Sequence, residues 1–174
     1  ERPYRATILY SLEIPVKDGV AIGDTMFAST TAAYDALGPD LKALLAQMKA
    51  LHRHGVGRDK KGVGHKLDHS QQAILKGIEH PIVRTHPRTG RKCIYVNRGC
   101  TARICGSDEL ACAALLEALE EHIARPEFVY RHNWRVGDIL MWDNCSTQHN
   151  AVADYELPLR RLIHRTVVQG DPVF

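Results

Sequence analysis

Hydrophobic and polar residues alternate over residues 5–15 of the chain. Ala6, Ile8, Tyr10, Leu12 and Ile14 share one parity, which predicts a strand with one buried face that Pro15 ends. Further strands are expected at residues 24–27, 128–130, 139–142 and 162–168. Residues 82–85 and 92–96 flank a Pro-Arg-Thr-Gly turn, and this arrangement predicts a hairpin.

Two segments have a helical period instead. Over residues 29–54, leucines and methionine recur at three and four positions, Thr30 or Thr31 can cap the first helix, and Gly38-Pro39-Asp40 breaks it. Residues 107–123 form the clearest helix, with Ser107 as the expected N-cap and an apolar face of Cys112, Leu115, Leu116, Leu119 and Ile123. Residues 55–77 lack a sustained period, which predicts a long flexible loop.

Short strands interrupted by helices predict a mainly β fold with helical insertions, either a barrel or a jelly roll. The 174 residues are enough for one domain with a real core, so a single domain over residues 1–174 is expected.

Composition narrows the function classes. The chain is 44% hydrophobic and 25% charged, and no apolar run approaches the roughly 20 residues of a membrane span. The net charge of +3 is small and scattered, which does not favour nucleic acid as a partner. Five cysteines without a C-x-x-C pair argue against a disulfide framework or a structural zinc site, and no secretory signal is evident after Glu1, so a reducing cytoplasm is expected.

His149 is the strongest candidate metal ligand. It follows a polar Ser-Thr-Gln run directly after the apolar strand that ends in Trp142, so its ring is expected at a strand edge facing a cavity. A core imidazole bonded to a backbone carbonyl is the alternative.

The second candidate feature is the arginine-rich strand near the C-terminus. A period of two places Arg161, Ile163 and Arg165 on one face, and two inward arginines would require an anion such as a carboxylate. The equally weighted alternative is an edge strand whose arginines lie in water.

Other motifs are weaker evidence for a function. His65 and His69 have a metal-binding spacing only on a helix, and the flanking glycines favour a mobile loop. Cys100 and Cys105 are expected to be small buried hydrophobes. The chain has no G-x-S-x-G elbow, P-loop or dinucleotide glycine fingerprint, which disfavours hydrolases, kinases and NAD enzymes.

The order of several motifs resembles one known family. They are Gly23-Asp24-Thr25, the segment Ala32-Ala33-Tyr34-Asp35-Ala36-Leu37, the run from His80 to Pro87 with Thr89-Gly90-Arg91-Lys92, Gly137-Asp138 through His149, and Arg160 to Arg165. Together they resemble the taurine dioxygenase and 2,4-dichlorophenoxyacetate dioxygenase family of iron(II), 2-oxoglutarate-dependent oxygenases.

The resemblance implies a double-stranded β-helix, a form of jelly roll, with iron held by two histidines and a carboxylate. It implies that His149 is the distal iron ligand, that Arg161 pairs with the far carboxylate of 2-oxoglutarate, and that Thr25 assists it. Arg165 resembles a second guanidinium that family members bring to the active site. The implied partners are dioxygen and a small anionic substrate, taurine-like, sulfonate or aryloxyalkanoate, and the implied products are succinate and carbon dioxide. A homo-oligomer is compatible with the sequence.

The chain departs from the family pattern in one serious respect. The family's His-x-Asp or His-x-Glu motif would fall at or before Glu1, and no histidine precedes His52. We therefore expect a fold incomplete at its N-terminus and weak retention of iron. Cys145 also stands where relatives commonly have arginine. The alternative function is a non-catalytic β-helix module that binds a carboxylate through Arg161 and Arg165 without metal.

Overall fold

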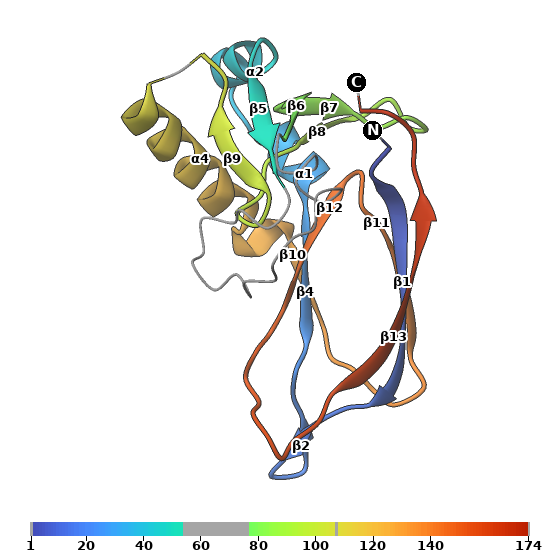
Figure 1. The fold of residues 1–174 in the computed structure, drawn as a ribbon. Coiled ribbons are helices and arrows are strands. Elements are labelled where there is room, and N and C mark those ends of the chain that lie inside the picture. Colours follow the sequence, from blue (N-terminus) through green and yellow to red (C-terminus); the bar gives the residue numbers. More distant parts are fainter. Residues whose placement is uncertain (1, 54–76, 107, 174) are drawn as a thin grey trace, which may run out of the picture.

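The computed structural model describes residues 2–53, 77–106 and 108–173. Two three-stranded antiparallel sheets face each other in it (Figure 1). The first has the order β11-β1-β13, with β1 at Tyr4–Glu13, β11 at Ile139–Asp143 and β13 at Leu162–Gln169. The second has the order β10-β4-β12, with β4 at Thr25–Ser29, β10 at Val129–His132 and β12 at Thr147–Ala151. Two facing antiparallel sheets agree with the jelly-roll expectation.

Aromatic rings fill part of the space between the two sheets. Phe27 on β4 and Trp142 on β11 meet edge to face, with their centroids 5.1 Å apart. Both side chains are at least nine-tenths buried. The sheets are therefore in direct contact at this level.

Strand β1 confirms the predicted strand, but its buried face is the opposite one. Thr7 and Ser11 are buried, whereas Tyr10, on the apolar parity, is 41% exposed. Thr7 accepts a hydrogen bond from Asn144, and Ser11 donates to the carbonyl of Arg135 and accepts from the backbone of Asp138. Polar side chains occur on the inner face because each has a partner there.

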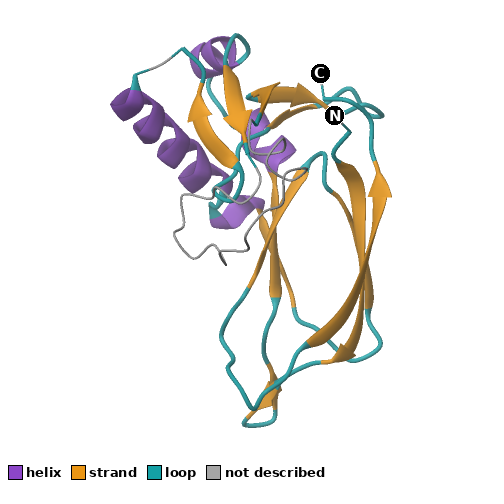
Figure 2. Ribbon diagram, in the orientation of Figure 1, coloured by secondary structure: helices purple, strands orange, loops and turns teal. Residues whose placement is uncertain are grey.

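A helical layer lies beside one end of the two sheets (Figure 2). It contains α1 (Thr30–Asp35), α2 (Pro39–Leu45) and α4 (Glu109–Ile123), with the sheet β6-β5-β9 formed by Ile78–Pro81, Lys49–His52 and Thr101–Ile104. The predicted apolar face of α4 is confirmed, because Cys112, Leu116, Leu119 and Ile123 join the main buried cluster and Leu115 packs against it.

Small elements complete the fold. The predicted hairpin is confirmed as β7 (Val83–Thr85) and β8 (Lys92–Ile94). Strands β2 (Val16–Lys17) and β3 (Val20–Ala21) form a second hairpin, whose Asp18 and Gly19 both have positive φ, as a type I′ turn requires. A short 3-10 helix, η1, spans Pro126–Phe128. None of the described helices is long and apolar enough to cross a membrane.

Several local predictions are wrong. The helical pattern over residues 29–54 ends earlier than expected, because residues 49–52 form the central strand β5, paired on both sides. Ser29 rather than Thr30 or Thr31 caps α1, and Asp108 rather than Ser107 caps α4 by accepting from Leu110 and Ala111. The expected loop at residues 55–77, with His65 and His69, falls outside the described residues except for Gly77.

Candidate active site

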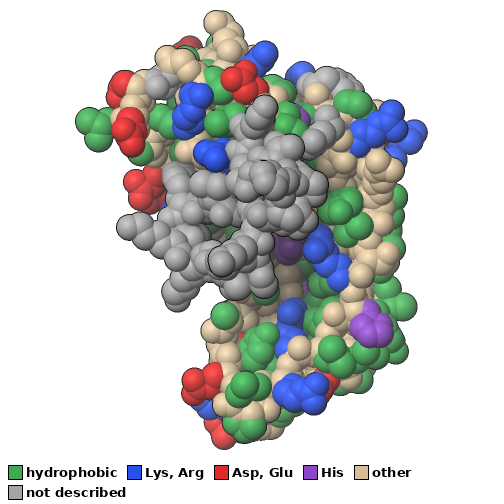
Figure 3. Space-filling view, in the orientation of Figure 1, with side chains coloured by type: hydrophobic (Ala, Val, Ile, Leu, Met, Phe, Trp, Pro, Cys, Tyr) green, Lys and Arg blue, Asp and Glu red, His purple; other side chains and the backbone are tan. Residues whose placement is uncertain are grey.

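The candidate site lies between the two facing sheets. The sequence predicted the His149 ring at a strand edge that faces a cavity. In the structure His149 is in the middle of β12, an outer strand of the sheet β10-β4-β12, and pairs with Phe27 of β4. Its ring lies 4.7 Å from the ring of Trp142 and 6.3 Å from that of Phe27. In Figure 3, basic and histidine side chains are visible in the hollow between the sheets.

The surroundings of His149 favour its neutral form. Although the side chain reaches solvent, partial burial against Trp142 and Phe27 lowers the pKa of the imidazole below its usual 6.5, and the positive charge of Arg165 lowers this pKa further. A neutral imidazole is the form that binds a metal ion. Arg165 is thus close enough to act on His149 electrostatically, while its own side chain is exposed.

Thr25 and Arg161 are in direct contact. The Arg161 guanidinium donates to Thr25 Oγ1 through Nη2 at 3.1 Å, and the Trp134 indole donates to the same oxygen at 3.0 Å. The guanidinium carbon also lies 5.7 Å from the centroid of the Trp134 ring, a cation–π distance. These three side chains come from β4, from the segment before β13 and from the connection between β10 and β11.

Arg161 retains an unused donor in this arrangement. Its Nε is buried and has no hydrogen-bond partner among the described residues. A buried guanidinium nitrogen without an acceptor is unfavourable, and a carboxylate that binds the guanidinium fork would remove that penalty. The structure therefore favours the hypothesis that Arg161 faces inward and binds an anion over the hypothesis that its side chain lies in water.

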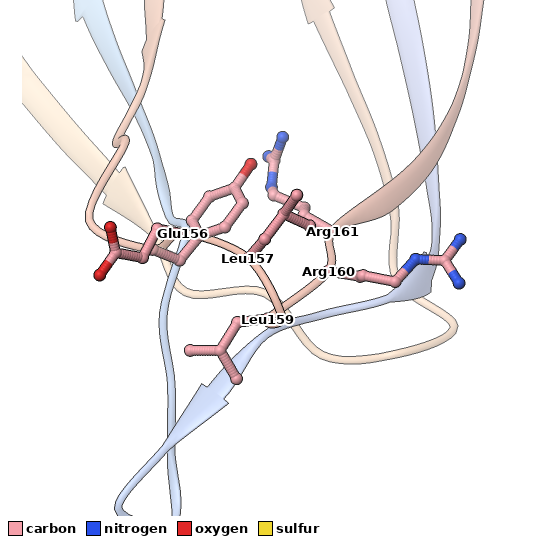
Figure 4. A pocket seen from close by; sticks show the side chains of 6 residues that line it. Glu156, Leu157, Leu159, Arg160 and Arg161 are labelled. Atoms are coloured by element: carbon pink, nitrogen blue, oxygen red, sulfur yellow. The ribbon is translucent and has the colours of Figure 1, made fainter.

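Arg160 behaves differently. Its guanidinium is exposed and lies 3.8 Å from the carboxylate of Glu13. In Figure 4 the side chains of Arg160 and Arg161 extend in different directions. Both line a cavity of about 420 Å³, together with Tyr155, Glu156, Leu157 and Leu159. Of the two adjacent arginines, only Arg161 contacts Thr25.

The Gly23-Asp24-Thr25 segment is fixed from both neighbouring strands. Asp24 is 3% exposed, and its Oδ2 accepts from Arg131 Nε and Asn133 Nδ2, each at 2.6 Å. The Asp24 carbonyl accepts from Val152, at 2.8 Å. Sequence reasoning missed Asp24, Arg131, Asn133 and Trp134 as parts of this site. The Gly-Asp-Thr motif was the one available signal, and it did not indicate its partners on β10 and in the residues directly after that strand.

One group of described side chains has the composition of a metal site. His86, Asp143 and Cys145 place their potential ligand atoms within 4.8 Å of one another. However, His86 Nδ1 accepts from the backbone of Arg88 and Thr89, both at 3.1 Å, so the proton of the neutral ring is on Nε2, which lies 2.5 Å from Asp143 Oδ2. A metal on Nε2 would require a protonated Nδ1 facing two N–H donors, so this group does not suit a metal.

The same group instead stabilises the turn that leads to His149. Asp143 Oδ1 accepts from the Cys145 backbone at 2.7 Å, and Oδ2 accepts from Ser146 Oγ at 3.0 Å. Burial by itself would raise the pKa of the Asp143 carboxyl, but the hydrogen bonds from Cys145, His86 and Ser146 outweigh it and lower this pKa. The buried Cys145 carbonyl accepts from Cys93 Sγ at 3.1 Å. Cys145 therefore helps to anchor this turn. The prediction that Cys100 and Cys105 are buried is wrong, because both are only partly buried.

At this site the described residues offer one imidazole to a metal ion and one guanidinium–hydroxyl pair to a carboxylate. No group of three metal-capable side chains in the described ranges includes His149. Thr25 and Arg161 are in contact, and Arg165 lies near His149. The residues fit the carboxylate of a co-substrate, and they fit a metal ion only through a single imidazole.

Comparisons with known proteins agree with this geometry. Residues 1–167 match the family model "Taurine catabolism dioxygenase TauD, TfdA family". The chain is 35% identical to the alpha-ketoglutarate-dependent 2,4-dichlorophenoxyacetate dioxygenase of Burkholderia sp. (strain RASC), over 85% of this chain and 49% of that protein. It is 31% identical to the alpha-ketoglutarate-dependent sulfate ester dioxygenase of Pseudomonas putida, over 96% of this chain and 56% of that protein.

The crystal structure of AAD-2 in complex with Mn(II) and N-oxalylglycine is also similar, with a TM-score of 0.86 and 31% identity over 99% of this chain and 66% of that one. The double-stranded β-helix, or jelly-roll, assignment is thereby confirmed. The chain spans about half the length of the curated relatives it matches. By the extent of these matches, the chain belongs to the taurine dioxygenase and TfdA family of alpha-ketoglutarate-dependent dioxygenases.

Proposed function

We propose that this chain carries the co-substrate carboxylate site and the distal metal ligand of an iron(II)- and 2-oxoglutarate-dependent dioxygenase. The observation that supports this most directly is the buried Arg161 Nε without a partner, beside a guanidinium already bonded to Thr25. Arg161 and Thr25 would bind the far carboxylate of 2-oxoglutarate, and His149 would hold the metal. When bound, iron would supply the activation of dioxygen that oxidises the substrate and converts 2-oxoglutarate to succinate and carbon dioxide.

The protein's own contribution is binding and orientation. Arg161 neutralises the carboxylate, and its fork geometry fixes the direction in which the rest of the molecule extends. His149, with its lowered pKa, presents a neutral nitrogen that a metal ion can bind.

For the primary substrate we propose a small organic anion, namely a sulfonate, a sulfate ester or an aryloxyalkanoate. The names of the relatives include a sulfate ester dioxygenase and a 2,4-dichlorophenoxyacetate dioxygenase. Arg165 would bind its acidic group, because its charge already acts on His149. A cytoplasmic location and a homo-oligomer stay predictions.

The matched pair Arg161→Ala and Arg160→Ala tests the proposal. Succinate formation from 2-oxoglutarate, measured with iron(II), ascorbate and a panel of such anions, should require Arg161, with the 2-oxoglutarate requirement rising at least tenfold in Arg161→Ala. Arg160→Ala removes an equal charge from the exposed neighbour and should leave that requirement within about twofold. Equal effects of the two variants would contradict the role of Arg161.

A non-catalytic carboxylate-binding module is the second candidate. It is favoured by the absence, among the described residues, of a group of three metal-capable side chains that includes His149. Under that alternative, 2-oxoglutarate binds in an Arg161-dependent manner but no succinate forms with any member of the panel.

A further inference from the structure

Trp134 contacts both side chains of the proposed carboxylate site, Thr25 and Arg161. It is 1% exposed and lies on the connection between β10 and β11. Its indole N–H donates to Thr25 Oγ1 at 3.0 Å, and its ring lies 5.7 Å from the Arg161 guanidinium carbon. The ring of His132 packs against Trp134 edge to face, with centroids 4.6 Å apart. Trp134 is therefore held in place while it contacts Thr25 and Arg161 together.

The two bonds to Thr25 determine what its hydroxyl can do next. A hydroxyl oxygen has two lone pairs and one hydrogen. Trp134 Nε1 and Arg161 Nη2 both donate to this oxygen, at 3.0 and 3.1 Å, so both lone pairs are engaged. Any third hydrogen bond of Thr25 must then be one that it donates. A donating hydroxyl suits an anion and does not suit a cation or a second donor.

Trp134 also constrains Arg161. A guanidinium over an aromatic face is attracted to the ring, and this contact limits the orientations of its plane. The buried Nε of Arg161 remains available as a second donor. The Thr25 hydroxyl hydrogen and the buried Arg161 Nε–H are therefore both available to an acceptor, together with the other guanidinium hydrogens that do not bond to Thr25.

The other tryptophan of the chain provides a contrast. Trp142 is also buried, at 8% exposed, but its indole nitrogen has no hydrogen-bond partner among the described residues. Replacing Trp142 with phenylalanine would therefore remove no hydrogen bond among the described residues. The hydrogen bond to Thr25 is thus specific to Trp134 and does not follow from burial of an indole.

We propose that Trp134 is a positioning residue of the co-substrate site. Its indole N–H makes Thr25 a donor, and its ring orients the Arg161 guanidinium, so that both point at one carboxylate. Trp134 itself does not touch that carboxylate. This inference rests on the proposed function, because it concerns the same site.

Trp134→Phe tests the proposal, because it keeps an aromatic side chain beside Arg161 and removes the indole N–H. It also removes buried volume, and Trp142→Phe makes the same change of size at another buried tryptophan. Glutarate is the first probe, since it has two carboxylates and no keto group to chelate a metal, and 2-oxoglutarate is the second. Titrations followed by NMR should show that Trp134→Phe raises the Kd for glutarate about tenfold, as expected for one lost hydrogen bond in a charged site. Trp142→Phe is the control for this binding measurement and should change the Kd less than twofold.

A double-mutant cycle separates positioning from general stability. Thr25→Val removes the acceptor of the indole bond. In that background Trp134→Phe should have little further effect on the Kd, whereas a merely structural role would give the same loss in both backgrounds. The proposal is overturned if Trp134→Phe weakens glutarate binding no more than Trp142→Phe does, or if its effect is unchanged in Thr25→Val.

A measurement on the unmodified chain covers the case in which Trp134→Phe does not fold. The chain has two tryptophans and therefore two indole N–H signals. The Trp134 indole N–H should exchange slowly with solvent, and glutarate should slow this exchange further. In Thr25→Val the exchange should be faster. An unchanged exchange rate in Thr25→Val contradicts the proposal. If Arg161→Ala leaves the Kd for glutarate unchanged, the proposed function itself is refuted.

Discussion

Gly23 shapes the carboxylate site by lacking a side chain. Its φ is +77°, a conformation that residues with a Cβ rarely adopt. A Cβ there would lie 3.0 Å from Tyr155 Cε1 and 3.1 Å from Arg161 Cδ. Its backbone N–H donates to Asp154 at 2.8 Å, which holds this close approach. The position of Arg161 thus depends on Gly23, an uncharged residue that a search for charged or metal-binding motifs would not identify.

Gly23→Ala should therefore weaken both folding and carboxylate binding. Backbone strain should cost about 1 kcal/mol of unfolding free energy, and crowding against Arg161 should add to it. Gly19→Ala is the matched control, because its φ is +78° and nothing lies within 4 Å of its Cβ position. Chemical denaturation and glutarate titration of both variants provide the measurement. Equal losses in the two variants would show that crowding is unimportant.

His149→Ala should remove most of the affinity of the chain for Mn(II), used as a redox-stable probe of the iron site. In the unmodified chain, Mn(II) should broaden the NMR signal of the Trp142 indole, because that ring lies 4.7 Å from the ring of His149. The lowered pKa of His149 should let this binding persist as the pH falls below 6.5, the usual value, because protons compete less well for the ring. His164→Ala is the control, because His164 is exposed on β13. Broadening that survives in His149→Ala would refute the ligand assignment.

At the level of elements, sequence patterns were reliable where packing follows local periodicity. The hairpin β7–β8 and the helix α4 were predicted correctly, because a turn sequence and a 3.6-residue period each specify one structure. Strand β5 was not, because its helical period continues from α2 and its strand conformation arises from pairing with β6 and β9. Strand β12 was missed because Thr147–Ala151 is mostly polar, and only its pairing with β4 defines it.

Strand β5 also introduces a dependence of stability on pH. Burial lowers the pKa of His52 to about 4, and the nearby His80 contributes. The ring stacks on Tyr95 at 4.9 Å. Because the unfolded chain binds this proton near pH 6.5 and the folded chain only near pH 4, stability is full above pH 6.5 and is lost as the pH falls toward 4, by about 3 kcal/mol at most.

His52→Phe should reduce this dependence, because it keeps an aromatic ring on Tyr95 and removes the titrating group. The difference in unfolding free energy between pH 7.5 and pH 5, measured by urea denaturation, should be smaller in His52→Phe than in the unmodified chain. An identical difference would mean that other groups dominate the acid sensitivity.

At the level of the whole molecule, the sheet β11-β1-β13 has an apolar outer face. Ile139 and Met141 on β11 are 73% and 65% exposed, and the register places them opposite Tyr10 and Ile8 of β1. Val168 of β13 is 44% exposed and lies opposite Ala6. Hydrophobic side chains are visible along this flank in Figure 3. A contiguous exposed patch of this kind promotes association.

We expect the 174-residue chain to self-associate through this face. The double variant Ile139→Lys, Met141→Lys should reduce association at concentrations where the unmodified chain forms larger species, because charge opposes burial of the patch. Sedimentation velocity over a concentration series is the measurement. A control pair, Leu110→Lys and Leu157→Lys, changes exposed residues outside this sheet and should have little effect. Unchanged association in the first variant would assign the contact to another surface.

The sequence by itself determined the β-rich class, the clearest helix, the hairpin and the identity of Thr25, His149 and Arg161 as candidates, because these depend on local period and on motif order. Only the tertiary structure decided which face of β1 is buried, that residues 49–52 are a strand, and that Arg161 rather than Arg160 reaches Thr25. It alone brought Trp134 to Thr25, 109 positions away in the chain. Contacts between distant residues depend on strand register and on how two sheets face each other, and neither is written in a local pattern.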